Sequence, residues 1–319
     1  MSLPKKRKLK KPKERKNKPR ILITGGLGFI FSHVTEYFVK KGWNVYVVDN
    51  LSVGSHPEII DDSFSFYPID INNLSPEFLQ YLDPQYVVHA AANSDVDFSI
   101  ENPMVSFNNN SFSTVRLLYL CRTLKNLKKF LYISTDEVYG ECDHRKNETE
   151  IIFPRNPYSL SKAVGSIARL AFDNTYPELK DKTAEVRFCN IFGPRQDARK
   201  IIPAIKRALE TQKPLPLHNN GEGYREWLYV KEVPPLIELV LLAGTRTYNI
   251  TANAGYTVKI LIELAESVTG KKVPITETER AGMDIAYEMD ATRIRNELHW
   301  QPKYEFITAF EAYLKNKPL

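Results

Sequence analysis

A glycine-rich turn between a β-rich run and a helical pattern constrains the fold of this chain more than any other feature. The run RILIT leads directly into TGGLGFI at residues 24–30, where the helical pattern begins. Such glycines let the backbone turn tightly and let a pyrophosphate approach the amides at the helix N-terminus. The next β-rich run, NVYVV, ends at Asp49, where a carboxylate can accept hydrogen bonds from an adenosine ribose. The pattern predicts a dinucleotide site that favours NAD over NADP, because the acid repels a 2′-phosphate.

After this turn the chain alternates β-rich runs with helical segments as far as residue 189. The predicted strands are 20–24, 44–48, 64–68, 85–89, 130–134 and 183–188, and the predicted long helices are 29–41, 106–123 and 158–174. Strands separated by helices of this length imply right-handed crossovers. We therefore predict an α/β fold with a Rossmann-like, doubly wound parallel sheet.

From Asn190 onward the alternation degrades, because prolines cluster and loops dominate. Short helices are predicted at 201–211, 232–243 and 257–269. We predict a smaller, irregular C-terminal lobe that binds the substrate and closes over a cleft. The predicted organisation is a basic tail at 1–19, an NAD-binding Rossmann domain at 20–189, and a substrate lobe at 190–319 with segments that return to the Rossmann domain.

The positive charge of the chain is concentrated at its start. Residues 1–20 hold 11 of the 44 basic residues and one of the 38 acidic residues, so the remainder is mildly acidic although the formal net charge is +6. The tail has several prolines and few apolar residues, so we expect it to be disordered. We weigh a nuclear-localisation or nucleic-acid-binding arm against a solvated tail that contacts an anionic partner weakly.

Several familiar chemistries lack their sequence patterns. The three cysteines are widely spaced and give neither a disulfide framework nor a metal signature. The chain contains no HExxH, paired CxxC or GxxxxGK[ST] motif, so we predict no metal site and no P-loop chemistry. It also has no apolar run long enough for a membrane span and no signal peptide, so we expect a cytoplasmic protein, or a nuclear one if the tail acts as an address.

A hydroxyl and two acids directly follow the fifth predicted strand. The motif STDEVYG contains Thr135, Asp136 and Glu137. These side chains should lie at the carboxyl edge of the sheet, where doubly wound folds bind ligands. Adjacent acids in a loop point in different directions and can take different protonation states. The motif is therefore a candidate for acid–base catalysis.

A tyrosine and a lysine open the helix that follows. Tyr158 and Lys162 are four residues apart and share one helical face. An ammonium can lower the pKa of a nearby phenol, and so can an oxidised nicotinamide. We therefore predict that Tyr158 acts as a base, assisted by Lys162.

Together these motifs resemble those of the extended short-chain dehydrogenase/reductases, and within that superfamily the nucleotide-sugar 4,6-dehydratases such as dTDP-glucose 4,6-dehydratase. The resemblance extends from about residue 20 to residue 317. The further motifs that show this resemblance are VVDN (47–50), HAAANSDVDFSIENP (89–103), NPYSLSK (156–162), FCNIFGPRQ (188–196), REWLYVKEV (225–233), TYNI (247–250) and ERAGMD (279–284). The Thr-Asp-Glu triplet discriminates best, because related epimerases and decarboxylases usually have other residues at the acid pair.

The resemblance implies a lyase with tightly held NAD that converts dTDP- or UDP-glucose to the 4-keto-6-deoxy sugar. Tyr158, assisted by Lys162, would take the proton of the 4-hydroxyl while hydride leaves C4 for NAD⁺. Thr135 would hydrogen-bond the oxygen at C4. Glu137 would remove the C5 proton, Asp136 would protonate the departing 6-hydroxyl, and the hydride would return to C6. Since the two acids need opposite protonation states at the start, we expect a raised pKa for Asp136.

The resemblance also implies binding residues. The predicted cofactor contacts are Gly25, Gly28, Phe29, Ile30, Asp49, Asn50, Asp70, Ile71, Ala90, Ala91, Ala92, Asn110, Tyr158 and Lys162. The predicted substrate contacts are Ser94, Asp97, Thr135, Asn190, Lys200, Arg225, Asn249 and Arg280. The two arginines suit a diphosphate, because a guanidinium binds phosphate oxygens in pairs. The C-terminal lobe would then bind a nucleotide sugar, and the family habit of pairing through four helices implies a homodimer.

Four positions depart from the family's pattern. Phe31 stands where a glycine lets the helix pack closely on the strand, so it requires a different side-chain direction or a shifted helix. Asn93 and Asp95 stand where a longer amide or acid and a histidine are common. Met283 stands where a histidine is usual near the nucleotide.

Two alternatives stay open at this point. A 4-epimerase or sugar-acid decarboxylase would share the fold, but epimerisation needs no acid for a leaving hydroxyl. A non-catalytic descendant that binds NAD or nucleic acid would agree with Phe31 and the basic tail, but the intact reaction residues argue against it. The sequence also leaves open the base, uracil or thymine, and the hexose.

Overall fold

The computed structural model describes every residue except 1–16, 53 and 280–285. Most of the predicted basic tail therefore lies outside the described residues, as do Arg280 and Met283. Among the helices in the described part of the chain, none is long and apolar enough to cross a membrane.

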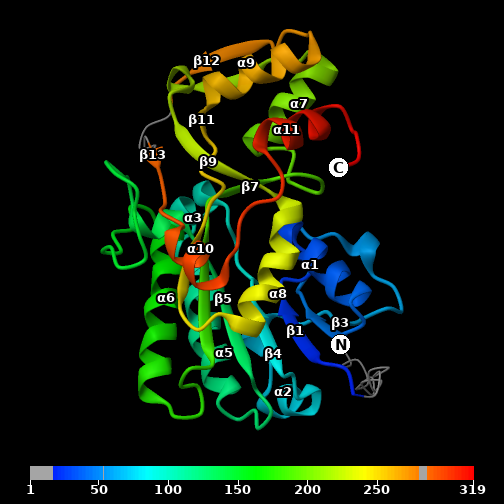
Figure 1. Cartoon of the computed structure of the whole chain (residues 1–319), viewed down its shortest axis with the longest axis vertical. Coiled ribbons are helices and arrows are strands. Elements are labelled where there is room, and N and C mark those ends of the chain that lie inside the picture. The colour runs from blue at the N-terminus through cyan, green and yellow to red at the C-terminus, as the bar shows by residue number, and fades with distance from the viewer. Residues whose placement is uncertain (1–16, 53, 280–285) are drawn as a thin grey trace, which may run out of the picture.

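A parallel sheet of seven strands forms the centre of the larger part of the molecule (Figure 1). In spatial order its strands are β10 (Thr247–Ile250), β6 (Thr183–Phe188), β5 (Lys129–Thr135), β4 (Tyr86–His89), β1 (Arg20–Thr24), β2 (Asn44–Val48) and β3 (Ser65–Tyr67). All neighbouring strands run parallel. The order reverses between β1 and β4, and the crevice at such a reversal is where doubly wound folds bind ligands. The predicted Rossmann-like fold is confirmed.

The six strands predicted from the sequence are present, with ends that move by at most one residue. The seventh strand, β10, is missing from the prediction. Its four residues, TYNI, lie beyond the point where the alternation of strands and helices degrades, and they pair with β6 only through the tertiary structure.

Helices cover both faces of the sheet (Figure 1). One face carries α1 (Phe29–Lys40) and α8 (Val233–Ala243), and the other carries α2 (Pro76–Leu82), α5 (Ser113–Cys121) and α6 (Pro157–Thr175). Successive strand residues point to opposite layers, so Ile21 and Ile23 join one buried cluster and Leu22 joins the other. Burial on both faces explains why the strands read as continuous apolar runs.

Shorter helical segments connect these elements. They are η1 (Pro57–Ile59), η2 (Ile71–Asn73), α3 (Val96–Glu101), α4 (Pro103–Ser106), the π-helical turn η3 (Phe107–Phe112) that continues into α5, η4 (Asp136–Tyr139), η5 (Asn219–Gly221) and η6 (Val230–Glu232). The helix predicted at 106–123 is thus present, but it begins as a π-helix.

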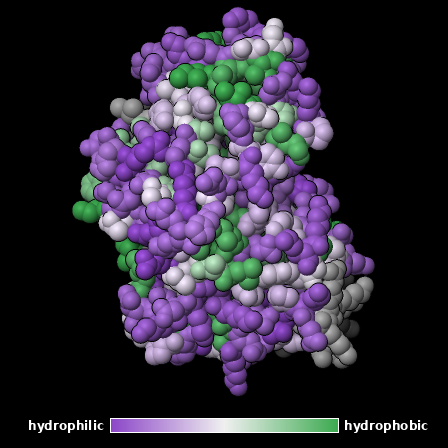
Figure 2. Space-filling view, viewed as in Figure 1, coloured by the Kyte–Doolittle hydropathy of each residue, from purple (hydrophilic) through white to green (hydrophobic). Residues whose placement is uncertain are grey.

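A smaller lobe stands at the carboxyl end of the sheet (Figure 1). Its strands are β7 (Asn190–Phe192), β9 (Tyr224–Tyr229), β11 (Gly255–Thr257) and β13 (Ala286–Tyr287) in one sheet, and β8 (Leu215–His218) with β12 (Ile275–Thr278) in another. Its helices are α7 (Ile201–Thr211), α9 (Val258–Thr269) and α11 (Phe306–Leu314), whereas α10 (Thr292–Leu298) packs on β10. The three predicted short helices are confirmed, but no strand of this lobe was predicted. In Figure 2 the visible face is mostly hydrophilic, with a hydrophobic band across this lobe.

Candidate active site

The hydroxyl and the two acids lie together at the carboxyl end of β5. Thr135 ends the strand, and its side chain caps η4 by accepting a hydrogen bond from the backbone N–H of Glu137. The same hydroxyl donates to Oδ1 of Asp136 over 3.0 Å. The other carboxyl oxygen of Asp136 is buried and has no hydrogen-bond partner among the described residues. This oxygen is therefore available to a bound ligand.

The protonation of Asp136 is shifted by its surroundings. Burial raises its pKa to about 7, and the neighbouring charge of Glu137 adds to the effect. The hydrogen bond from Thr135 and the charge of Arg225 act in the opposite direction. The direction of the shift is the one expected from the sequence, so Asp136 can hold a proton near neutral pH.

The start of α6 brings Tyr158 to the same place. Asn156 caps the helix by accepting from the backbone N–H of Ser159 over 2.8 Å, and the Ser159 hydroxyl accepts from the N–H of Asn156 over 3.1 Å. The amide of Asn156 also donates to Oε2 of Glu137 over 3.3 Å. This capping residue, to which the sequence argument gave no role, therefore ties the start of α6 to the catalytic acids.

Tyr158 interacts with the hydroxyl and both acids of η4. It is buried, and its side chain interacts with that of Thr135. Burial raises the pKa of Tyr158 well above its ordinary value, and the charges of Glu137 and Asp136 raise it further. Lys162 is not among the groups that act on the pKa of Tyr158 in the described part of the chain, so the lowering expected from the sequence is not seen.

Lys162 lies one turn further along α6 and is also buried. Burial lowers the pKa of its ammonium to about 7, and the charge of Glu185 opposes that shift. The ammonium lies over the ring of Tyr132, 4.5 Å from the ring centroid. Lys162 is thus held by groups that the sequence argument did not consider.

The glycine turn has the geometry of a phosphate-binding site. Gly25 has φ +68°, and a Cβ there would lie 2.8 Å from the Cα of Ala91 at the end of β4. Gly28 is the N-cap of α1, and no side chain caps this end of the helix. A Cβ at Gly28 would meet only the carbonyl oxygen of Gly25, at 3.3 Å. The half-buried first residues Phe29 and Ile30 leave amides that can bind a pyrophosphate, so the turn fits the dinucleotide predicted from the sequence.

Asp49 fixes the turn from the end of β2. It is buried, and its carboxylate accepts from the backbone N–H of Leu27 at 3.1 Å, the N–H of Leu51 at 2.9 Å and the hydroxyl of Ser55 at 3.1 Å. Three bonds leave about one of the four acceptor positions of a carboxylate for a ribose.

The other predicted cofactor contacts border the same crevice. Asn50 donates to Asp70 over 3.0 Å, and Asp70 caps η2, in which Ile71 is buried. Ala90, Ala91 and Ala92 are half-buried at the end of β4. Asn110, the remaining predicted contact, is almost fully buried.

Asn110 lies in the π-helical turn, and it is 1% exposed. Its amide oxygen accepts from the backbone N–H of Asn93 over 2.8 Å. Its amide nitrogen donates to the backbone carbonyl of Asn93 and to the hydroxyl of Ser161, each over 3.0 Å. It therefore joins the loop after β4 to α6. This geometry supports a positioning role rather than direct contact with a cofactor.

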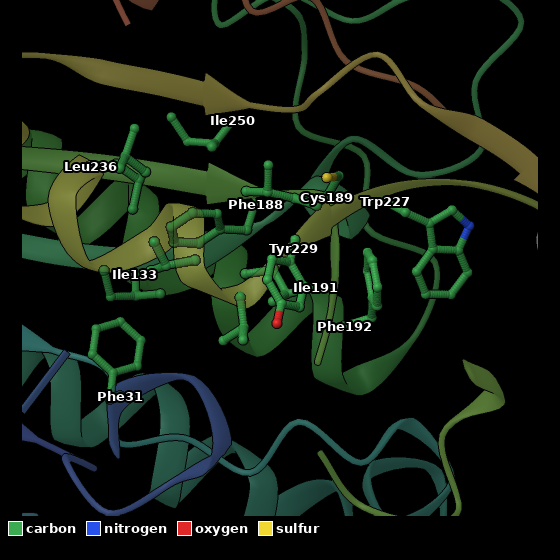
Figure 3. Close-up of a cluster of buried hydrophobic side chains, with 14 of the residues drawn as sticks. Phe31, Ile133, Phe188, Cys189, Ile191, Phe192, Trp227, Tyr229, Leu236 and Ile250 are labelled. Atoms are coloured by element: carbon green, nitrogen blue, oxygen red, sulfur yellow. The ribbon is translucent and has the colours of Figure 1, made fainter. Parts of the chain in front are cut away.

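The structure accommodates Phe31 by directing its ring into the core. Phe31 is 5% exposed and belongs to the buried cluster between α1, α8 and the sheet. Figure 3 shows the ring pointing toward Ile133, with Phe188 and Leu236 beyond it. The sequence allowed either a different side-chain direction or a shifted helix, and the structure shows a side chain that is directed into the core.

This packing makes a testable prediction about stability. Replacing Phe31 with alanine should lower the free energy of unfolding by about 3–5 kcal/mol, because the change leaves a cavity in the core. Urea denaturation measures the loss. Phe153→Ala is the matched control, since Phe153 is 69% exposed and its loss should change stability by less than about 0.5 kcal/mol. A Phe31→Ala protein that keeps its stability and binds NAD more tightly would show that the ring occupies the dinucleotide groove instead.

The predicted substrate contacts divide into accessible and inaccessible residues. Ser94 is exposed before α3 and Asp97 is exposed in its first turn. Asn190 is half-buried at the start of β7, and Lys200 is exposed at the N-terminus of α7. Asn249 is fully buried in β10, as described next. Arg280 lies outside the described residues.

The assignment of Asn249 to the substrate site is not supported by its surroundings. Its side chain is fully buried in β10 and accepts from the hydroxyl of Tyr139 over 2.8 Å. It also donates to the carbonyls of Lys146 and Asp290, at 2.8 and 3.3 Å. Both amide hydrogens and one acceptor position of the amide oxygen are directed to the protein, so we propose a structural role for Asn249.

Two buried acids that the sequence argument passed over act on the site. Glu226 is fully buried in β9, contributes to the raised pKa of Asp136, and pairs with Arg145 over 2.9 Å. Glu185 is fully buried in β6 and acts on Lys162. The sequence did offer a signal for both residues, because each is an acid inside a β-rich run, TAEVRF or YREWLY. Next to Glu226, Arg225 stacks over the ring of Tyr287, 4.4 Å from its centroid.

Comparison with known proteins adds independent information. Residues 22–312 match the family described as GDP-mannose 4,6 dehydratase. The chain is 33% identical to a dTDP-glucose 4,6-dehydratase of Salmonella typhimurium, over 93% of each chain. Among solved structures it resembles a dTDP-glucose 4,6-dehydratase of Bacillus anthracis in complex with NAD, with TM-score 0.84, 29% identity, and coverage of 93% of this chain and 96% of that one. It equally resembles a UDP-glucose 4-epimerase of Thermotoga maritima with UDP-glucose, with TM-score 0.86, 29% identity, and coverage of 92% and 97%.

Proposed function

The chain belongs to the GDP-mannose 4,6 dehydratase family, among the nucleotide-sugar 4,6-dehydratases of the extended short-chain dehydrogenase/reductases, and from this premise we propose that it converts dTDP- or UDP-glucose to the 4-keto-6-deoxy sugar with NAD. One observation carries the proposal. The side chains of Tyr158 and Thr135 interact, and the charges of Asp136 and Glu137 act directly on Tyr158. A base, a hydroxyl and two acids can therefore act on the same hexose.

Oxidation at C4 requires a base at the 4-hydroxyl. Tyr158 would take this role, and Thr135 would hydrogen-bond the same sugar oxygen. Bound NAD⁺ supplies the hydride acceptor for C4 and the hydride that later reaches C6. Because burial and the acids hold the proton on Tyr158, the phenol needs positive charge nearby, and Lys162 is the cation that α6 offers.

Loss of the 6-hydroxyl requires one carboxyl that gives a proton and one that takes a proton. Asp136 holds a proton near neutral pH, since its pKa is raised to about 7, so it can protonate the leaving hydroxyl. Glu137 is half-buried and oriented by Asn156, so it can take the proton from C5. The C–O bond at C6 then breaks, and water leaves.

We also propose how the ligands are held. The open N-terminus of α1 behind Gly28 would bind the pyrophosphate of NAD, and Asp49 would accept from the ribose. Arg225 would bind the diphosphate of the substrate close to the sugar site, because its charge already acts on Asp136. Asn190, at the start of β7, and Lys200, the N-cap of α7, would contribute further contacts from the small lobe.

A direct assay tests this function. The full chain is incubated with NAD and, separately, with dTDP-glucose, UDP-glucose and GDP-mannose, and the ultraviolet absorbance of a 4-keto sugar in alkali is followed. We expect product with one or both of the glucose nucleotides. Full NAD binding without product from any of the three would favour a non-catalytic protein.

We further propose that the chain forms a homodimer through α5 and α6. Large apolar side chains are exposed on these packed helices and on the turns before α5. They include Met104 (78% exposed), Phe112 (57%), Tyr119 (57%), Ile167 (55%) and Leu170 (44%). Two helices from each of two copies would cover this surface.

Light scattering after size exclusion tests the dimer. The wild-type chain should have twice its monomer mass, and Ile167→Glu should shift it to the monomer. Leu242→Glu is the matched control, because Leu242 is equally exposed, at 59%, but lies on α8. A wild-type monomer at all concentrations, or equal effects of the two variants, would refute this interface.

A further inference from the structure

A row of side chains from three neighbouring strands lies beneath α6. The strand register pairs His89 of β4 with Tyr132 of β5, and Tyr132 with Glu185 of β6. Side chains at paired positions point to the same face of a sheet. The row is fully buried, and it lies on the side of the sheet that α6 covers.

Tyr132 contacts Lys162 in two ways. Its ring face lies under the ammonium, 4.5 Å away, and its hydroxyl donates to the backbone carbonyl of Lys162 over 3.1 Å. Gly165 makes room for this arrangement, since a Cβ at that position would overlap the hydroxyl of Tyr132. The helix and the ring are therefore fitted to each other around the lysine.

Glu185 supplies the negative charge next to this ring. Its carboxylate accepts from the hydroxyl of Ser166 over 2.6 Å and from Nε of Arg187 over 2.8 Å. A second arginine, Arg169, approaches it to 3.5 Å. Two arginines keep the carboxylate ionised, and Ser166 holds it one turn along α6 from Lys162.

The remaining titratable neighbours of Lys162 carry no positive or negative charge at neutral pH. Burial lowers the pKa of His89 to about 3, so this ring is neutral, and it is held between the hydroxyls of Thr24 and Thr114. Tyr158, on the helix itself, keeps its proton because burial and the η4 acids raise its pKa. The ring of Tyr132 and the charge of Glu185 are thus the groups that favour the ammonium.

We infer that Tyr132 and Glu185 form a seat that keeps the buried Lys162 ammonium charged and fixed one turn along α6 from Tyr158. Both are positioning residues, and their relevance to catalysis rests on the proposed function. An ammonium over a desolvated aromatic face is stabilised electrostatically by the ring, and the carboxylate adds to this. Without the seat, burial would discharge the amine and leave Tyr158 without a cation.

Titration of Lys162 by NMR tests the role of the ring. The full chain is labelled with ¹³C at lysine Cε, and the signal of Lys162 is identified by its loss in Lys162→Met. In Tyr132→Leu the midpoint of this signal should fall by about one pH unit or more, because the ring is lost. In Tyr132→Phe, which keeps the ring and loses only the hydroxyl, it should stay within a few tenths of a unit. Equal midpoints in the two variants would overturn the inference.

The same NMR titration of Lys162 in Glu185→Gln tests the role of the Glu185 charge. The midpoint should fall by about one unit, because the amide keeps the shape but not the charge. Glu148→Gln is the matched control, since Glu148 is another buried acid near an arginine, Arg293, and is not among the charges acting on Lys162. An unshifted midpoint in Glu185→Gln removes the carboxylate from the seat. If this variant does not fold, the two Tyr132 variants decide.

The titration needs no substrate, so its outcome is separate from that of the proposed function. A chain that shows the predicted midpoints but makes no 4-keto sugar would refute the function and leave the seat in place. An active chain with unchanged midpoints would refute the seat alone. In an active chain the alkaline limb of the pH profile of C4 oxidation, where Lys162 loses its proton, should move to lower pH in Tyr132→Leu and stay in place in Tyr132→Phe.

Discussion

Replacing Tyr158 with phenylalanine is expected to slow oxidation at C4 by about 100-fold to 10 000-fold, the usual contribution of a positioned base. The phenol is the group that interacts with Thr135 at the proposed sugar site, and phenylalanine keeps its volume while removing the proton acceptor. The measurement is a single turnover with bound NAD, followed by the absorbance of the reduced nicotinamide.

A matched tyrosine controls for general damage. Tyr248 is equally buried but lies on β10, where its hydroxyl binds Glu297 over 3.1 Å. Tyr248→Phe should keep the wild-type rate of nicotinamide reduction. If Tyr158→Phe also keeps that rate, Tyr158 is not the base, and the proposed arrangement of the site is wrong.

Asp136→Asn is expected to separate the two halves of the reaction. The amide cannot protonate the departing hydroxyl, so loss of the 6-hydroxyl should slow by about 100-fold or more, whereas oxidation at C4 should change little. Rapid quenching and mass spectrometry distinguish the 4-keto hexose from the 4-keto-6-deoxy product. Equal slowing of both steps would remove Asp136 from the acid role.

The same substitution should stabilise the protein at alkaline pH. Because the folded state raises the pKa of Asp136 from 3.8 to about 7, the folded state favours the protonated form. Its contribution is therefore lost as the pH rises from about 4 to 7. Asparagine escapes this loss, so at pH 8 the variant should gain up to about 4 kcal/mol in free energy of unfolding relative to its difference at pH 4. Urea denaturation at the two pH values measures the change, and a constant difference would show that the pKa of Asp136 is not raised.

The sequence predicted those features that depend on local patterns. The glycine turn, the six strands before residue 189 and the helices α1, α5, α6, α7, α8 and α9 follow from periodicity and from residues with special backbone preferences, whereas α2, α10 and α11 were not predicted. The raised pKa of Asp136 was expected in direction, because adjacent acids with different tasks need different environments.

Other features depend on tertiary contacts and were missed. The strands of the small lobe are three to six residues long, apart from the two-residue β13, and they pair across long stretches of chain, so no local period marks them. Asn249 matched a family motif, but only the folded structure shows that its amide is occupied by Tyr139 and two carbonyls. The position of Phe31 was flagged from sequence, yet its direction into the core depends on space beside Ile133.

The transfer of a labelled hydride tests the central claim most directly. The wild-type chain with NAD is given dTDP-glucose and UDP-glucose that carry deuterium at C4, and the product is examined by NMR. If one site oxidises C4, removes the 6-hydroxyl and returns the hydride, deuterium should appear at C6 of a 4-keto-6-deoxy sugar. Deuterium that returns to C4 of an epimerised hexose would contradict this account and identify a 4-epimerase.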